Sequence, residues 1–293
     1  MVGPTAVGKT SLAIALAKEY QTEIISADSR QFYRELTIGT AKPTPTELAQ
    51  VKHHFIDSLS IEEDYTAGDF EREGLQKLNE LFLGHDIVVA VGGSGLFVRA
   101  LCEGLDDLPK APISVRTALN ETLEKHGLPY LQNELKKIDP LYYEQADLAN
   151  PQRVIRALEV FQASGKPISF YLNNQVYQKK RDFRVITIGL NTQRDLLYDR
   201  INQRVELMMQ NGLLEEVQNL IPFRNKAALL TVGYGELFQY LAGEITLEKA
   251  IELIKQNSRR YAKRQITWFK KYGNTTWFEP TEFQGIKKYI EQE

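Results

Sequence analysis

The octet GPTAVGKT, Gly3 to Thr10, lies two residues from the start of the chain and indicates the fold. It matches the phosphate-loop pattern G-x-x-x-x-G-K-[ST] at every fixed position. Backbone N–H groups of such a loop converge on an anion, assisted by the positive end of the helix that follows. Lys9 adds a charge for terminal phosphate oxygens, and the Thr10 hydroxyl can hold Mg²⁺. The phosphate site is therefore predicted to comprise Gly3, Pro4, Thr5, Ala6, Val7, Gly8, Lys9 and Thr10.

The composition excludes several classes of protein. The 293 residues suffice for one large domain or two, and the 43% apolar and 25% charged shares are those of a globular protein. No apolar run is long enough to span a membrane and no export segment is present, so a cytoplasmic location is predicted. Cys102 is the single cysteine, which excludes an internal disulfide or a cysteine-cluster zinc site and favours a core-filling role.

Short apolar strands alternate with helical segments along the first half of the chain. Helices are predicted over residues 10–20 and 70–84, and strands over 23–28, 86–93 and 184–190. This alternation predicts an α/β, P-loop NTPase-like parallel sheet with helices on both faces. A phosphate loop normally follows a buried strand, yet only Met1 and Val2 precede this one. We therefore expect the first strand to be truncated in this sequence.

Residues 109–182 differ from the segments around them. They carry helical periodicity, no convincing strand, and several prolines that divide them into short helices. We interpret them as a mostly helical insertion in a discontinuous core formed by residues 1–108 and 183–293. From Arg194 to the end of the basic stretch near residue 271, the pattern is again helical.

Asp28 is the carboxylate best placed for chemistry. It ends the predicted strand EIISAD, whereas DIVVAV runs into GGSG and RVITIGL into Asn191, so neither of these strands ends in an acidic residue. Nucleotide hydrolases hold Mg²⁺ with a further carboxylate at such a strand end. Asp28 should face the crevice at the carboxyl edge of the sheet. There it could bind a metal, accept a proton from a nucleophile, or cap the next turn.

Other candidate groups lie further along the chain. Ser94, in the glycine-rich turn 92–95, supplies a hydroxyl directly after a strand. Arg200 and Arg204 are four residues apart, share a helix face and could clamp a diphosphate, or be exposed and pair with nearby acids. The stretch 258–272 mixes basic and aromatic residues with no acidic one. It could hold a nucleic-acid backbone and stack on bases, or be a solvated helix face.

Taken in order, these motifs resemble the tRNA dimethylallyltransferases, also called tRNA isopentenyltransferases, over nearly the whole chain. The resemblance rests on GPTAVGKT, DSRQFYRELTIGTAKP (28–43), GGSGLFVRAL (92–101), NPQRVIRALEV (150–160), RINQRVELM (200–208) and AKRQITWF (262–269). It implies transfer of a dimethylallyl group from its diphosphate to the exocyclic amine of the adenosine immediately 3′ of the anticodon. The phosphate loop would then hold a leaving diphosphate, and no hydrolytic water or second carboxylate would be needed.

The resemblance also assigns roles to the catalytic candidates. Lys9, Thr10, Mg²⁺ and Arg200 would stabilise charge as the allylic C–O bond breaks, with Arg204 a further diphosphate ligand on the same helix face. Asp28 would receive or orient the amine proton. Ser94 stands where relatives usually carry threonine, so its hydroxyl function is retained.

The implied partners are dimethylallyl diphosphate and a tRNA anticodon stem-loop, with no membrane and no obligate protein partner. The helical insertion would grip the stem-loop, whose target base must leave its stack to react. The residues expected to contact tRNA are Asp28, Ser29, Arg30, Gln31, Gln152, Arg153, Val154, Ile155, Arg156, Arg259, Lys263, Arg264 and Gln265. The chain departs from the family at Gly235, where relatives often carry a longer polar side chain, and it has no cysteine–histidine finger after the core.

Two alternatives remain at this point. A P-loop kinase of a nucleoside or small metabolite would use ATP, with Asp28 as base and the arginines as its lid. A non-catalytic RNA-binding protein would retain the loop without its chemistry, although the intact Lys9–Thr10 pair and Asp28 argue against this.

Overall fold

The computed structural model describes residues 1–106, 108–173 and 180–293. It divides into two compact units, one formed by residues 1–103 and 181–293, the other by residues 104–180. Each unit is described by itself. The insertion predicted over 109–182 falls largely within the second unit, with slightly different boundaries.

The first unit is built on short parallel strands. Strands β1 (Ile24–Ser26), β2 (His53–His54) and β3 (Val89–Val91) form one sheet in the order β2-β1-β3. Strands β4 (Ile188–Leu190) and β5 (Thr276–Phe278) form a second parallel pair. Met1 and Val2 lie between the two groups. Val2 donates to the Ile188 carbonyl at 2.8 Å, and the Met1 amine donates to the Ala90 carbonyl at 2.6 Å.

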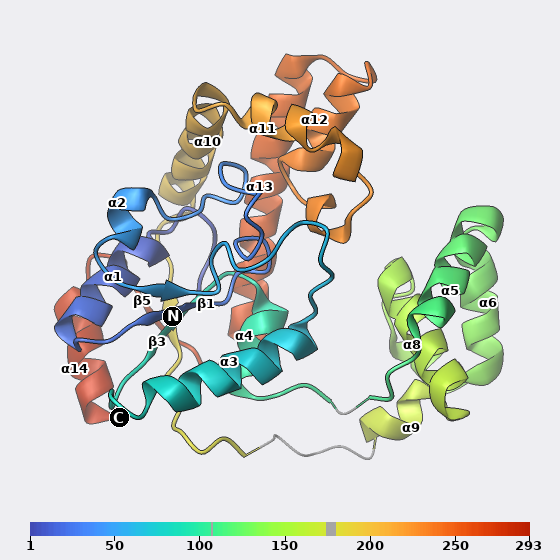
Figure 1. The fold of residues 1–293 in the computed structure, drawn as a ribbon, viewed down its shortest axis with the longest axis horizontal. Helices are drawn as coiled ribbons and strands as arrows, with labels where there is room; N and C mark the ends of the chain where they lie inside the picture. Colours follow the sequence, from blue (N-terminus) through green and yellow to red (C-terminus); the bar gives the residue numbers. More distant parts are fainter. Residues whose placement is uncertain (107, 174–179) are drawn as a thin grey trace. The chain divides into compact units, whose positions relative to one another are not determined.

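Helices cover both faces of these strands, as Figure 1 shows, which confirms the predicted α/β fold. The side chain of Ile24 belongs to the core shared with α1 and α14, whereas that of Ile25 belongs to the core shared with α3 and α4. Successive strand residues point to opposite faces, so both faces need an apolar cover. The covering helices are α1 (Lys9–Glu19), α3 (Ala67–Leu81), α4 (Gly95–Cys102) and α14 (Phe283–Gln292).

The helical pattern predicted from Arg194 onward is confirmed. The elements are α10 (Arg194–Gln210), α11 (Leu213–Asn219), η1 (Ile221–Phe223), η2 (Ala227–Leu229), α12 (Tyr234–Leu241) and α13 (Leu247–Lys271). Helix α13 packs against α10 and α12 and reaches α4. Three short elements were not predicted from sequence: α2 (Pro45–Leu48), β2 and β5. Helices α4 and α14 were not predicted either.

The second unit is a small helical assembly with its own apolar core. Its helices are α5 (Ile113–His126), α6 (Leu128–Ile138), α7 (Pro140–Gln145), α8 (Pro151–Ser164) and α9 (Ile168–Asn173). Prolines stand in the first turns of α6, α7 and α8, where a missing N–H leaves no helix hydrogen bond unmade. Leu131, Leu135, Val154 and Ile155 are at most 1% exposed and form the centre of this core. In the described residues of both units, no helix has the length and apolar character needed to cross a membrane.

Candidate active site

The phosphate loop has the geometry its sequence predicts. Gly8 adopts a left-handed conformation, with φ of 105°, directly before the first residue of α1. Gly3 approaches Leu190 so closely that a Cβ atom would lie 2.5 Å from its carbonyl oxygen. Lys9 folds back over the loop and donates to the carbonyls of Gly3 at 3.0 Å and Pro4 at 2.7 Å. The lysine ammonium thus lies against the backbone of the loop.

The electrostatic environment of Lys9 is unusual. Burial lowers the pKa of the Lys9 ammonium to about 8; the nearby charge of Asp28 opposes this shift, and that of Arg204 adds to it. The three groups are therefore close enough to interact. An ammonium in such a position gains much from an incoming anion, because the anion replaces the lost hydration.

Gln265, on α13, holds the phosphate loop against the glycine-rich turn. Its side-chain oxygen accepts from the Thr5 N–H at 2.8 Å, and its nitrogen donates to the Gly93 carbonyl at 3.0 Å. The residue is 6% exposed. A Cβ atom at Gly93 would lie 2.3 Å from this nitrogen, so only glycine permits the contact. The expected tRNA contact of Gln265 is thus corrected, because its amide is occupied inside the protein.

Asp28 and Ser94 meet across the turn that follows β1. One Asp28 carboxylate oxygen accepts from the Arg30 N–H at 3.0 Å, which leaves the second oxygen for another donor. Ser94 accepts from the Ser29 N–H at 2.9 Å, and its hydroxyl donates to the Ser29 hydroxyl oxygen at 3.1 Å. Tyr261, on α13, is hydrogen-bonded to Ser94, and burial raises the pKa of its phenol to about 12. Ser94 thus joins the turn that carries Asp28 to α13.

Glu216, on α11, fixes the loop that borders this turn. Its carboxylate accepts from the backbone N–H groups of Thr37, Ile38 and Gly39 at 3.0, 2.7 and 3.1 Å, and from the Tyr234 hydroxyl at 2.7 Å. Gln31 donates to two carbonyls further along the same loop, those of Thr40 and Ala41, each at 3.3 Å. Sequence reasoning missed Glu216 and Tyr234, because their partner loop lies about 180 residues earlier in the chain.

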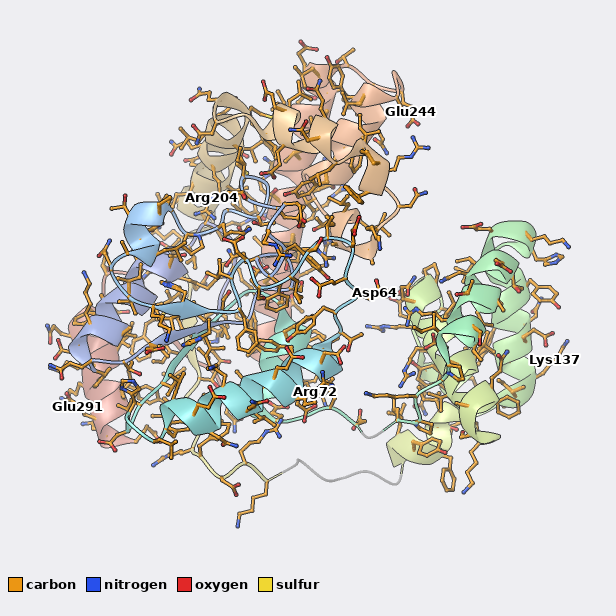
Figure 2. The ribbon with its side chains drawn as sticks, in the orientation of Figure 1. Asp64, Arg72, Lys137, Arg204, Glu244 and Glu291 are labelled. Carbon is orange, nitrogen blue, oxygen red and sulfur yellow. The ribbon has the colours of Figure 1, made fainter. Side chains whose placement is uncertain are left out.

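The structure separates Arg200 and Arg204, which both lie on α10. Arg204 is half-buried and lines the cleft beside the phosphate loop, and burial lowers the pKa of its guanidinium (Figure 2). Arg200 is exposed and does not line this cleft. Arg204 therefore stands where the sequence analysis expected Arg200 to act, and the catalytic role of Arg200 stays a prediction.

These groups line a single cleft of about 1090 Å³. The phosphate loop, the Asp28 turn, Ser94 and the loop at residues 39–44 line it together with α10 and α13, and α10 contributes the apolar side chains of Ile201, Val205 and Met208. The predicted site residues that line it are Thr5, Ala6, Gly8, Lys9, Thr10, Asp28, Ser29, Arg30, Gln31, Ser94, Arg204, Arg264 and Gln265, and Tyr261 lines it as well. Gly235 also lines it, and a Cβ atom built there meets nothing within 4 Å.

The basic residues of the stretch 258–272 point to different sides of α13. Arg264 reaches the cleft and lies over the Tyr261 ring, 5.7 Å from its centroid. Lys263 is exposed outside the cleft lining. Arg259 turns toward α10, where it donates to the Asn202 side chain at 2.5 Å and lies 5.9 Å from the Tyr198 ring. Only part of the predicted basic surface therefore borders the cleft.

In the helical unit, α8 carries the other predicted tRNA residues. Gln152, Arg153 and Arg156 are exposed or half-buried, whereas Val154 and Ile155 are fully buried in the core. Val154 and Ile155 are thus corrected from contact residues to core residues, because a helix turns successive side chains away from a common face.

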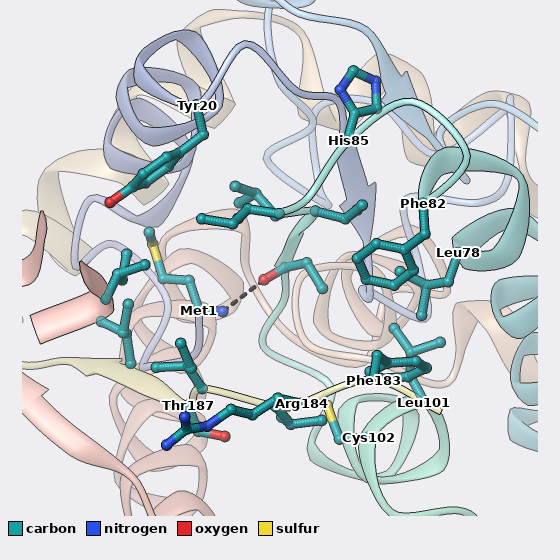
Figure 3. A pocket seen from close by; sticks show the side chains of 18 of the residues that line it. Met1, Tyr20, Leu78, Phe82, His85, Leu101, Cys102, Phe183, Arg184 and Thr187 are labelled. Atoms are coloured by element: carbon teal, nitrogen blue, oxygen red, sulfur yellow. Dashed lines mark hydrogen bonds between the residues drawn. The ribbon is translucent and has the colours of Figure 1, made fainter. Parts of the chain in front are cut away.

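A second cavity, of about 650 Å³, has a different character. Figure 3 shows it beside Met1, with Leu78, Phe82 and Phe183 among its apolar lining residues. Cys102 also lines it, and burial raises the pKa of the Cys102 thiol, which disfavours the reactive thiolate. No set of three or more His, Cys, Asp or Glu residues placed to hold a metal is found within residues 1–106, 108–173 and 180–293.

The fold and the cleft together define an α/β protein of the P-loop type, in which the phosphate-loop motif and Asp28 line the same cleft. A family model described as IPP transferase matches residues 31–272. The tRNA dimethylallyltransferase of Christiangramia forsetii is 52% identical over 99% of this chain and 96% of that protein. That of Cytophaga hutchinsonii is 50% identical over 99% and 95%. The chain therefore belongs to the IPP transferase family of prenyl-transferring enzymes.

Solved structures agree. The full-length tRNA isopentenylpyrophosphate transferase from Bacillus halodurans is 37% identical, with a TM-score of 0.73 over 99% of this chain and 94% of that one. A eukaryotic dimethylallyltransferase acting on tRNA is 25% identical, with a TM-score of 0.76 over 99% of this chain and 75% of that one.

Proposed function

We propose that this protein transfers the dimethylallyl group of dimethylallyl diphosphate to the exocyclic amine of the adenosine immediately 3′ of the anticodon in tRNA, in the cytoplasm. The observation that carries the proposal is the shared cleft. Lys9, Thr10, Asp28, Ser94 and Tyr261 all line it, so a leaving diphosphate and an attacking amine can be bound together.

The diphosphate end would lie on the phosphate loop. Burial removes hydration from Lys9 and Arg204, and a bound anion would supply the missing charge compensation to both. As the allylic C–O bond breaks, its electron pair leaves with the diphosphate, and fixed positive charges stabilise that developing charge. Ile201, Val205 and Met208, on the same wall as Arg204, offer an apolar surface for the hydrocarbon group.

The acceptor end would lie at Asp28. The amine nitrogen forms the new C–N bond, and its proton passes to the Asp28 carboxylate oxygen that does not accept from Arg30. Ser94 and Ser29 hold the turn that carries Asp28, which limits the positions available to the carboxylate. The reaction balances with no added water, oxidant or nucleotide.

The residues present suit Mg²⁺ that arrives with the substrate. Thr10 lines the cleft next to Lys9, and magnesium in proteins is commonly held by few side-chain oxygens together with substrate phosphates. Thr10 would hold the ion, whose positive charge would help to stabilise the leaving diphosphate.

The test is transfer of label. The protein is incubated with Mg²⁺, labelled dimethylallyl diphosphate and a tRNA that has adenosine immediately 3′ of its anticodon. Label should enter the tRNA, and a tRNA with guanosine at that one position should remain unlabelled. ATP consumption without label in the RNA would favour a small-molecule kinase instead. Binding of tRNA with neither activity would leave a non-catalytic RNA-binding protein.

A further inference from the structure

A buried carboxylate in the helical unit pairs with two partly exposed arginines. Glu159, on α8, has a side chain that is 4% exposed, and it is one of the buried residues of that helix together with Val154, Ile155 and Leu158. One carboxylate oxygen lies 3.3 Å from Arg116 on α5, and the other lies 3.4 Å from Arg156 one turn earlier on α8. An unpaired charge at such a position is strongly unfavourable, so the two guanidinium groups explain how it is tolerated.

Both arginines remain accessible while they pair with Glu159. The side chain of Arg116 is 49% exposed and that of Arg156 is 35% exposed. Arg116 also donates to the Gln152 side-chain oxygen at 2.6 Å, so its guanidinium plane is held from two directions. A guanidinium has five N–H donors, and these contacts use a minority of them. The remaining donors are ordered and available to an outside acceptor.

The charge of this surface matches an anion. Two arginines around one carboxylate leave a net positive charge, and exposed Arg153 adds another from the first turn of α8. That turn is the positive end of the helix. Pre-ordered guanidinium groups bind phosphate through paired N–H donors. They therefore suit a phosphodiester backbone better than a single mobile lysine does.

We propose that Glu159 is a positioning residue that orders Arg116 and Arg156 into a docking surface for RNA backbone phosphates, with Arg116 a direct contact. The inference rests on the proposed function, since it assigns this surface to the tRNA substrate. The proposal predicts a change in RNA affinity opposite to the one that charge alone would give. Removing an acidic residue from an RNA-binding surface ordinarily strengthens binding, whereas loss of this positioning carboxylate weakens it.

The experiment measures affinity of the full-length protein for a substrate tRNA transcript at several salt concentrations. Glu159→Gln keeps the side-chain size and removes the charge that orders the guanidinium groups. We expect the dissociation constant to rise by about threefold to tenfold in this variant. Arg116→Gln should raise it by about fivefold and reduce the slope of log affinity against log salt by roughly one.

Matched variants distinguish the effect of where a positive charge lies from the effect of the total charge. Lys137→Gln removes one positive charge from the same unit at an exposed side chain on α6, labelled in Figure 2, and should change affinity less than about twofold. Arg116→Lys keeps the charge but loses the planar fork, and should bind between the wild type and Arg116→Gln. The turnover number at saturating tRNA should stay within about twofold of wild type in all four variants, because the cleft is untouched.

The proposal is overturned if Glu159→Gln binds tRNA as tightly as wild type or more tightly, or if Arg116→Gln behaves like Lys137→Gln. Because Glu159 is buried, circular dichroism must show a folded variant; if it is unfolded, the exposed Arg116 variants decide the matter alone. Equal loss of poly-glutamate and tRNA binding in Arg116→Gln would assign the surface to an acidic protein instead. Failure of the proposed function is recognised separately, as absence of label transfer by the wild-type protein.

Discussion

The turn that begins at Asp28 and the start of α8 present their polar residues in different ways. In the turn, four successive residues, 28–31, all line the cleft, because each is held by a backbone or side-chain contact of its own. On α8, five successive residues, 152–156, are divided by helical periodicity into outward polar and inward apolar side chains. A contiguous motif in a turn can be a contiguous surface, whereas the same motif on a helix cannot.

The largest test of this comparison is at Asp28. Asp28→Asn keeps the acceptor for the Arg30 N–H but removes the proton acceptor, so the turnover number should fall by about 10²-fold or more. Affinity for dimethylallyl diphosphate should be kept, because the phosphate loop is unchanged. Single-turnover kinetics with labelled diphosphate measure the chemical step directly.

The control for this variant is Asp64→Asn, which removes an exposed carboxylate that does not line the cleft. It should behave like the wild type. Near-normal turnover in Asp28→Asn would remove Asp28 from the mechanism and leave the ordered turn as a binding feature only.

The phosphate side of the cleft predicts a pH dependence. In the proposed function Lys9 binds the diphosphate as an ammonium, and burial lowers the pKa of Lys9 to about 8. Because the lowered pKa belongs to a cation, its charge is present below pH 8 and is lost as the pH rises through that value. The ratio kcat/KM for dimethylallyl diphosphate should therefore fall by about tenfold between pH 7 and pH 9.

Lys9→Arg supplies the matched measurement. Arginine stays charged throughout this range, so the variant should show a lower but flat profile between pH 7 and pH 9. If kcat/KM fell in parallel in both proteins between pH 7 and pH 9, a group other than Lys9 would cause the loss of activity at high pH.

Much of the fold followed from local patterns. The β-branched runs before Asp28 and Gly92, and the helical periodicity after Arg194, predicted strands and helices that the structure contains. Those signals lie within ten or twenty neighbouring residues. Strand β5 has only three half-buried residues, so it offered no such pattern.

The site was less predictable because its arrangement depends on contacts distant in sequence. Gln265 joins loops 172 and 260 residues away, and Glu216 holds a loop 177 to 179 residues away. Contacts between residues so far apart leave no hydrophobic periodicity in the sequence from which they could be predicted. Arg200 and Arg204 share one helix face in sequence, yet one turn of α10 is about 5.4 Å long, which is enough to put one inside the cleft and one outside.

The test with the smallest expected effects compares the buried face of α8 with its exposed face. Ile155→Val removes one methylene group from the core of the helical unit and should lower the opening free energy of α8 by about 1 kcal/mol, with tRNA affinity unchanged. Arg153→Gln, on the exposed face, should weaken tRNA binding by about threefold and leave the opening free energy unchanged. Hydrogen exchange read by mass spectrometry measures the first quantity, and a binding titration the second. If Ile155→Val instead weakened tRNA binding in a folded protein, the five residues would act as one contiguous contact surface and the contrast with the Asp28 turn would be lost.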